Sequence, residues 1–212
     1  MSGAQPVVFI VDDDAAVRDS LSLLLELRGF RSRSFASAEA FLSAYAPELR
    51  GCVIIDLRMP GMGGAALQEQ LAARGAALPV IIVTAHGDIA AARNALKGGA
   101  VDFIEKPIDD EQLIAAIRAA LDREAEQRAG MTRAADLARR LERLTARERQ
   151  VMDLVVAGRH NREIAGELGI SPRTVEVYKA RLMEKLQVRR IPDLIRLALG
   201  DASRSATDKD RA

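Results

Sequence analysis

Three carboxylates stand directly after short apolar runs, at positions where they could share a cation. Asp12 and Asp13 follow the run at residues 7–11, and Asp56 follows the run at residues 53–55. Such runs of branched apolar residues are typical of strands buried on both faces of a parallel sheet. The carboxyl ends of parallel strands meet at one edge, where open α/β sheets hold their ligands. Oxygen ligands without His or Cys favour Mg²⁺.

Two further polar side chains are expected at the same edge. Thr84 ends the run at residues 79–84, and Lys106 follows the run at residues 101–104. A carboxylate-bound Mg²⁺ suits phosphoryl transfer, because it shields the charge of an incoming phosphate and lets a carboxylate attack phosphorus. Lys106 can then pair with phosphoryl oxygens, and Thr84 can hydrogen-bond them. Taken singly, the aspartates could be turn residues, Lys106 a surface lysine and Thr84 an ordinary strand residue. Together, the three carboxylates, the lysine and the threonine at one edge indicate phosphoryl chemistry.

Five strand patterns alternate with five helical patterns in the first part of the chain. The strands are expected at residues 7–11, 31–35, 53–56, 79–84 and 101–104. The helices are expected at residues 15–28, 37–45, 65–74, 88–97 and 110–124, with Asp14, Asp88 and Asp109 as caps. This alternation is typical of an α/β domain with a doubly wound parallel sheet and right-handed crossovers.

A charged segment, residues 125–143, follows the α/β domain at residues 1–124. It is rich in Arg, Glu and Ala, and Gly130 is expected to interrupt it. Leu137 and Leu141 recur at helical spacing, so the part after Gly130 is predicted to be a linker helix with a solvated charged face. The alternative is that this helix binds a partner or dimerises.

Residues 144–200 predict a small all-α domain of four helices. These are expected at residues 145–157, 162–168, 172–186 and 192–199. Thr145 and Glu148 have the spacing of a capping box, and Asn161 and Ser171 are expected to cap the next two helices. The second and third helices, with a short turn between them, make a helix-turn-helix. The polar tail, residues 201–212, is expected to be disordered.

Charge is divided unevenly between the two parts. Residues 1–124 carry 12 Lys and Arg against 17 Asp and Glu, and the rest carries 19 against 13, so the net charge of +1 hides an acidic and a basic half. This predicts cation binding in the first part and polyanion binding in the second. The single cysteine excludes an internal disulfide. With no apolar run of about 20 residues and no signal-peptide pattern, we expect a cytoplasmic protein without membrane contact.

The helix at residues 172–186 has an apolar and a basic face. Val175, Leu182 and Leu186 are expected to pack inward. The opposite face carries Arg173, Glu176, Val177, Lys179, Ala180 and Arg181. A helix of this kind fits the major groove of B-DNA, with the cations on phosphates and Glu176 and Val177 near base edges. A solvated surface helix is the alternative, but the helix-turn-helix and the basic charge favour DNA.

Residues 7–124 resemble the receiver domain of two-component response regulators. The resemblance rests on Asp12-Asp13, Asp56, Thr84-Ala85 and Lys106-Pro107, in order and at the usual spacing. It implies a sheet in the order 2-1-3-4-5 and transfer of a phosphoryl group from a sensor histidine kinase to Asp56. It also implies Mg²⁺ held by Asp12, Asp13, Asp56 and the backbone carbonyl of Arg58. Phe103 would be an aromatic switch residue, and the Lys106–Pro107 bond would be cis.

Residues 144–199 resemble the output domain of the NarL/FixJ (LuxR-type) regulators. The matching residues are Leu144-Thr145, Arg147-Glu148, Gly158, Asn161, Glu163-Ile164-Ala165, Leu168, Ile170-Ser171, Thr174-Val175 and Lys185-Leu186. Residues 84–88 and 102–107 are most similar to the FixJ branch. The resemblance adds Thr174 and Lys185 to the expected DNA contacts. Tyr178 departs from the pattern, since histidine is frequent there, and this leaves one backbone contact open.

These observations predict a phosphorylation-dependent transcription regulator that is not an enzyme. Its expected partners are the kinase, double-stranded DNA, a second copy of itself after phosphorylation, and RNA polymerase. A phosphatase with Asp56 as nucleophile would commonly carry a second carboxylate two residues on, where this chain has Arg58. A flavodoxin-like nucleotide-binding domain would want glycines at residues 12–14. A DNA-binding protein whose receiver is only a dimer scaffold stays open.

Overall fold

The computed structural model describes residues 5–85, 93 and 96–198. Two compact units make up the chain, Met1–Ala129 and Gly130–Ala212. Among the described residues, no helix combines the length and the apolar character that a bilayer crossing requires.

The first unit contains a five-stranded parallel sheet in the order β2-β1-β3-β4-β5, as expected. The strands are β1 Val7–Val11, β2 Arg31–Phe35, β3 Gly51–Asp56, β4 Val80–Thr84 and β5 Asp102–Glu105. Strand β3 begins two residues earlier than predicted, at Gly51, where a Cβ would lie 1.8 Å from the carbonyl oxygen of Val7. Only glycine permits this close backbone approach, at a φ of 129°.

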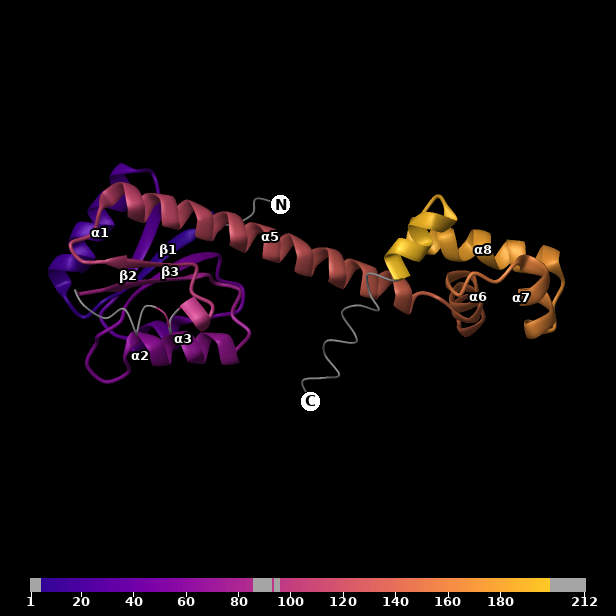
Figure 1. Ribbon diagram of the computed structural model, residues 1–212, viewed down its shortest axis with the longest axis horizontal. Helices are drawn as coiled ribbons and strands as arrows, with labels where there is room; N and C mark the ends of the chain where they lie inside the picture. The colour runs from indigo at the N-terminus through magenta and orange to yellow at the C-terminus, as the bar shows by residue number, and fades with distance from the viewer. Residues whose placement is uncertain (1–4, 86–92, 94–95, 199–212) are drawn as a thin grey trace. The chain divides into compact units, whose positions relative to one another are not determined.

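Helices cover both faces of the sheet, so the domain has three layers. Helix α1 (Ala15–Leu27) and the N-terminal part of α5 (Asp110–Glu142) lie on one face, and α2 (Ala38–Ala44) and α3 (Gly64–Ala73) lie on the other (Figure 1). Alternate residues of the central strands point into two separate cores. Every residue of β3 and β4 is buried, which explains why these strands read as continuous apolar runs. The helix expected at residues 88–97 lies largely outside the described residues.

Helix α5 differs most from its prediction. It runs without interruption from Asp110 to Glu142, through Gly130, where we expected a break. A glycine inside a helix costs only about 1 kcal/mol relative to alanine. The residues around Gly130 are strong helix formers, mostly Ala, Arg, Glu and Gln, so the helix continues.

The second unit is helical, as predicted. It contains α6 (Ala146–Val156), α7 (Asn161–Leu168), α8 (Pro172–Leu186) and helical residues 191–198. Thr145 caps α6 in a capping box with Glu148, and Ser171 caps α8. The cap of α7 was predicted one residue too late: it is His160, whose backbone N–H donates to Glu163 Oε2 at 2.7 Å. The predicted tail, residues 201–212, lies outside the described residues.

Candidate functional site

Two of the three predicted carboxylates meet at the carboxyl edge of the sheet. Asp12, after β1, and Asp56, at the end of β3, are both buried. The ammonium of Lys106 joins them, 2.9 Å from Asp12 Oδ2 and 2.7 Å from Asp56 Oδ1. Their mutual repulsion is thus balanced by a lysine from the loop after β5. Although burial lowers the pKa of Lys106, the hydrogen bonds to Asp56 and Asp12 raise it above its ordinary value, which keeps this lysine charged.

Backbone N–H groups hold the remaining oxygens of these carboxylates. Asp12 Oδ1 accepts from the N–H of Asp14 at 2.8 Å, and Asp56 Oδ2 accepts from the N–H of Arg58 at 2.7 Å. Asp13 lies at the same strand end but is exposed. Among the described residues, no three acidic, His or Cys side chains converge as a ready metal cluster. The two buried carboxylates are therefore held in place by hydrogen bonds, whereas Asp13 is exposed to solvent.

Thr84 places a buried hydroxyl at the same edge of the sheet. Its side chain is 1% exposed, and Oγ1 has no partner among the described residues. A buried hydroxyl left unpaired costs about 1–3 kcal/mol. A hydroxyl of this kind at a strand end is explained if it donates its hydrogen bond to an oxygen of a bound ligand. The backbone carbonyl of Thr84 accepts from the N–H of Lys106 at 2.7 Å, so the two residues are held side by side.

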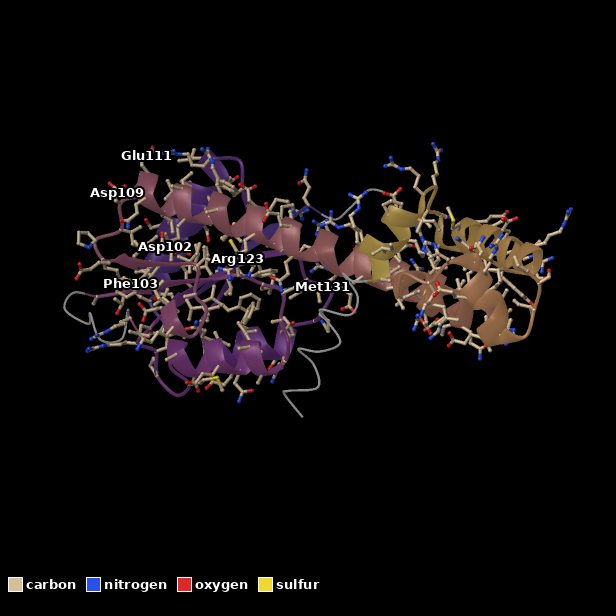
Figure 2. The ribbon with its side chains drawn as sticks, turned by 45° about the vertical axis from the view of Figure 1, so that its right-hand side comes forward. Asp102, Phe103, Asp109, Glu111, Arg123 and Met131 are labelled. Carbon is tan, nitrogen blue, oxygen red and sulfur yellow. The ribbon has the colours of Figure 1, made fainter. Side chains whose placement is uncertain are left out.

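The other predicted receiver residues lie on β5 and the loop after it. Phe103 is half-buried on β5 and packs against the core beneath α2 and α3 (Figure 2). The Lys106–Pro107 bond is cis, as the resemblance implied. Neither observation tests the switch role expected of Phe103, which stays a prediction.

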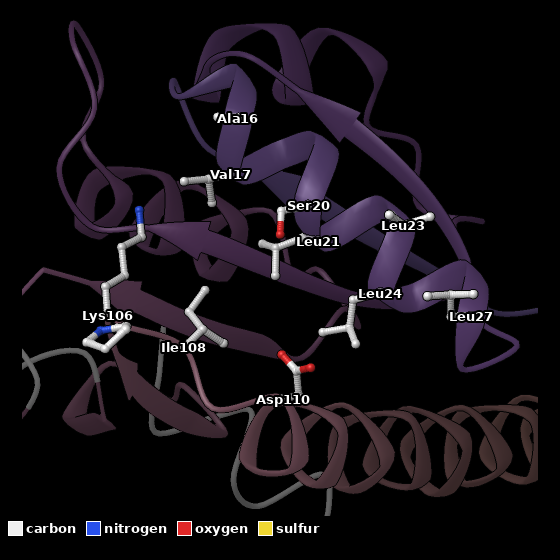
Figure 3. Close-up of a pocket in the computed structure, with 11 residues that line it drawn as sticks. Ala16, Val17, Ser20, Leu21, Leu23, Leu24, Leu27, Lys106, Ile108 and Asp110 are labelled. Carbon is white, nitrogen blue, oxygen red and sulfur yellow. The ribbon is translucent and has the colours of Figure 1, made fainter.

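An apolar groove of about 590 Å³ borders this edge, between α1 and the loop after β5 (Figure 3). Leu21 and Leu24 of α1 and Ile108 of the loop line it, and Lys106 lies at one end. On the rim, Leu23 is 58% and Leu27 is 76% exposed. Exposed leucines beside a groove are typical of a surface that contacts another protein.

The predicted faces of α8 are largely as expected. Val175, Leu182 and Leu186 are buried in the core of the second unit. The residues exposed on the opposite side are Arg173, Glu176, Val177, Ala180 and Arg181. Thr174 is half-buried, and its hydroxyl lies 2.8 Å from that of Ser171.

Two lysines expected to contact DNA make contacts within the second unit. Lys179 Nζ donates to Asn161 Oδ1 at 3.0 Å and so ties α8 to α7. Lys185 Nζ lies 2.6 Å from Glu148 Oε2 and also donates to the carbonyl of Arg143. Glu148 is 3% exposed and Lys185 is 30% exposed, so the pair joins a buried carboxylate to a partly exposed ammonium.

Sequence reasoning did not assign these partners. The structural role predicted for Asn161 and Glu148 was helix capping, and Glu39, whose carboxylate reaches the loop after Asp56, was not singled out. No pattern in the sequence marks such pairs, because the partners come from different elements. The capping-box spacing gave Glu148 a local role, and only the packing of α6 on α8 adds the second one.

Both units match known family models. Residues 8–118 match the response regulator receiver domain, and residues 142–198 match the bacterial regulatory proteins of the luxR family. The transcriptional regulatory protein FixJ of Azorhizobium caulinodans is 49% identical over 91% of both chains. The response regulator protein TodT of Pseudomonas putida is 42% identical over 93% of this chain and 87% of its own. The solved structure of the response regulator StyR, 43% identical, covers 93% of this chain with a TM-score of 0.85.

Proposed function

Because the chain belongs to the two-component response regulators that join a receiver domain to a LuxR-type DNA-binding domain, we propose that phosphorylation of Asp56 controls its binding to DNA. It is a transcription regulator of a two-component system. We propose that residues 1–124 receive the phosphoryl group from a sensor histidine kinase, and that residues 144–200 bind promoter DNA. Residues 125–143, the end of one continuous helix, would connect them.

The arrangement of Asp56, Lys106 and Thr84 supports this proposal most strongly. An Asp56 oxygen would attack phosphorus as the phosphorus–nitrogen bond to the donor's histidine breaks. Lys106 would then exchange its contact with Asp56 for one with a phosphoryl oxygen. The hydroxyl of Thr84, which has no partner among the described residues, would donate to a second oxygen. The Lys106 ammonium already carries the positive charge that would pair with the phosphoryl group. The Thr84 hydroxyl is a donor without a partner among the described residues.

Mg²⁺ fits the donor set at this edge. Asp12 and Asp56 present buried carboxylates and Asp13 an exposed one, all hard oxygen donors of the kind that Mg²⁺ prefers. The backbone carbonyl of Arg58 is the fourth ligand that we propose. When bound, Mg²⁺ would neutralise charge on the phosphoryl oxygens. Lys106 would release Asp12 when Mg²⁺ binds, because the ammonium and the metal ion would compete for the same carboxylate oxygen.

We propose that the kinase docks along the groove between α1 and the loop after β5. A phosphodonor protein must bring its histidine to Asp56, and this groove ends at Lys106, which contacts Asp56. The exposed Leu23 and Leu27 would supply the apolar contact. No enzymatic activity of its own is proposed, because Arg58 stands where phosphatases of this type commonly carry a second carboxylate.

Thr84→Ala is expected to separate phosphorylation from its consequence. The variant should accept the phosphoryl group, because Asp56 and the groups around it are intact, yet it should dimerise poorly. The phosphate adds about −1.5 to −2 charges at Asp56, and Thr84 is the neutral donor placed to respond to it. Light scattering of the two phosphorylated proteins is the measurement, with Thr84→Ser as the matched variant that keeps the hydroxyl. Equal dimerisation of Thr84→Ala and wild type would show that Thr84 is not the link.

In the DNA-binding domain, we propose that α8 enters the major groove. Arg173 and Arg181 would bind phosphates, and Glu176, Val177 and Ala180 would face base edges. Thr174 and Lys179 lie at the edge of this face. We propose that Lys185 instead holds α8 in place through Glu148. Two phosphorylated copies would bind adjacent half-sites at a promoter in the cytoplasm, within reach of RNA polymerase.

Two exposed residues of α8 distinguish phosphate from base contacts. Arg181→Ala should weaken binding to specific and random DNA by similar factors and lower the salt slope by about 1. Glu176→Ala should cost about 1–3 kcal/mol on the preferred site alone and leave the slope unchanged. The measurement is a salt titration of both variants on random DNA and on a site selected from a random pool. An effect of Arg181→Ala confined to the selected site would mean that α8 docks differently.

A further inference from the structure

Glu39, on the first turn of α2, contacts the loop that follows the phosphoacceptor strand. We infer that Glu39 is a positioning residue for the Mg²⁺ site, acting through the backbone of residues 57–63 without touching the cation. This inference rests on the proposed function, because it concerns the same carboxyl edge. It assigns a role to a side chain that lies outside every motif discussed above.

The loop is anchored at both ends by hydrogen bonds that its backbone N–H groups donate. At its start, the N–H of Leu57 donates to the carbonyl of Val83 at 2.9 Å, and the N–H of Arg58 donates to Asp56 Oδ2 at 2.7 Å. At its end, the N–H of Gly64 donates back to the carbonyl of Leu57 at 3.0 Å. A Cβ at residue 64 would lie 2.3 Å from the carbonyl oxygen of Asp56, so only glycine lets the loop close this tightly.

Glu39 holds the far side of the same loop. Its Oε1 accepts from the N–H of Met62 at 2.9 Å, although the two residues are 23 positions apart in sequence. It also approaches Gly61, which has a φ of 73° and where a Cβ would lie 3.0 Å from Oε1. A larger residue at position 61 would displace the Glu39 carboxylate by a few tenths of an ångström, and the positive φ independently favours glycine there.

The charge state of Glu39 matches this role. Its own backbone N–H and that of Met62 lower the pKa of the carboxyl below its ordinary value, against the opposing effect of desolvation. The group is thus ionised at neutral pH and acts only as an acceptor. Hydrogen bonds from N–H groups to a carboxylate are stronger than those to a neutral oxygen.

These contacts connect Glu39 to the proposed metal ligand. Residues 58–61 lie between the Asp56 anchor and the Glu39 anchor, so the direction of the Arg58 carbonyl depends on both. Loss of the Glu39 contact frees the Met62 N–H and lets the loop sample other conformations. The carbonyl would then be oriented for Mg²⁺ only part of the time, which weakens the affinity for Mg²⁺ while Asp56 and Lys106 remain in place.

The test compares Glu39→Ala, Glu39→Gln and the matched charge loss Glu69→Ala, at an exposed site on α3. Calorimetric titration with Mg²⁺ alone should give a dissociation constant about tenfold higher for Glu39→Ala, the low end of the loss seen when a residue supporting a metal ligand is removed. Glu39→Gln keeps an oxygen that accepts from Met62 and should stay near wild type. Hydrogen exchange at the Met62 amide should accelerate in Glu39→Ala only.

Phosphorylation by acetyl phosphate supplies a separate readout. Glu39→Ala should require more Mg²⁺ for half-maximal rate and reach the wild-type rate at saturation. An unchanged Mg²⁺ constant in Glu39→Ala, or an equal rise in Glu69→Ala, overturns the inference. If wild-type protein binds Mg²⁺ but takes up no phosphoryl group, the proposed function fails, and the calorimetric comparison still decides the role of Glu39.

Discussion

The Asp56→Asn protein is expected to take up no phosphoryl group from acetyl phosphate and Mg²⁺, whereas the wild-type protein should take up one. The reason is chemical: the amide lacks the anionic oxygen that attacks phosphorus, and it removes a ligand from the proposed Mg²⁺ site. The fold should persist, because Lys106 retains its contact with Asp12 and asparagine fills the same space. Intact-protein mass spectrometry measures the outcome.

Asp14→Asn is the matched control for this substitution. It makes the same change close to the site, and asparagine can still cap α1 by accepting from the N–H of Ala16, as Asp14 does at 2.8 Å. Asp14→Asn should therefore be phosphorylated like wild type. Full incorporation in the Asp56→Asn protein would falsify Asp56 as the acceptor and place the phosphoryl group on another residue.

Lys185→Met should unfold the DNA-binding domain far more readily than a substitution on the outer face of the same helix. It leaves the Glu148 carboxylate, 3% exposed, without its cation. Removing one partner of a buried pair costs about 3–5 kcal/mol, and we expect the lower value because Lys185 is 30% exposed. Urea unfolding followed by circular dichroism measures the loss, with Arg181→Met as the matched control.

The same ion pair predicts how the stability of the wild-type domain depends on pH. Burial raises the pKa of Glu148. The hydrogen bonds from Lys185 and Thr145 together lower it by more, so the pKa in the folded state lies below the ordinary value. A carboxyl with a depressed pKa stabilises the fold above its unfolded pKa, about 4.3, and this contribution is lost as the pH falls through the folded pKa. The free energy of unfolding of the Lys185→Met protein should therefore fall less than that of the wild-type protein as the pH is lowered into the acidic range. If Lys185→Met weakens DNA binding without lowering stability, Lys185 contacts DNA and is not a structural residue.

The sheet could be predicted because its central strands are buried on both faces. Strands β1, β3 and β4 contain no polar residue before their last positions. The apolar runs therefore mark the strands, and the first polar residue marks the edge of the sheet. For the same reason Asp12, Asp56 and Thr84 could be placed together. The edge strand β2 was also placed correctly, at Arg31–Phe35, although only its last residue, Phe35, is buried.

What escaped prediction depends on contacts between distant elements. The sequence indicated that a cation should neutralise Asp12 and Asp56, but it did not show that Lys106 does so. The contacts of Glu39 with Met62 and of Lys185 with Glu148 likewise depend on how the elements pack. Their partners are 23 and 37 residues apart in the sequence. The continuous α5 escaped because a local signal, Gly130, was given more weight than the strong helix formers around it.

The most direct test of the central claim measures phosphorylation and DNA binding on one sample. Full-length protein is incubated with acetyl phosphate and Mg²⁺, and its mass and its affinity for a selected DNA site are followed over the same time course. We predict that the mass rises by one phosphoryl group, that affinity rises in step with it, and that neither changes for Asp56→Asn. Phosphorylation at Asp56 with no change in DNA affinity would contradict the account and leave the receiver domain as a dimer scaffold only.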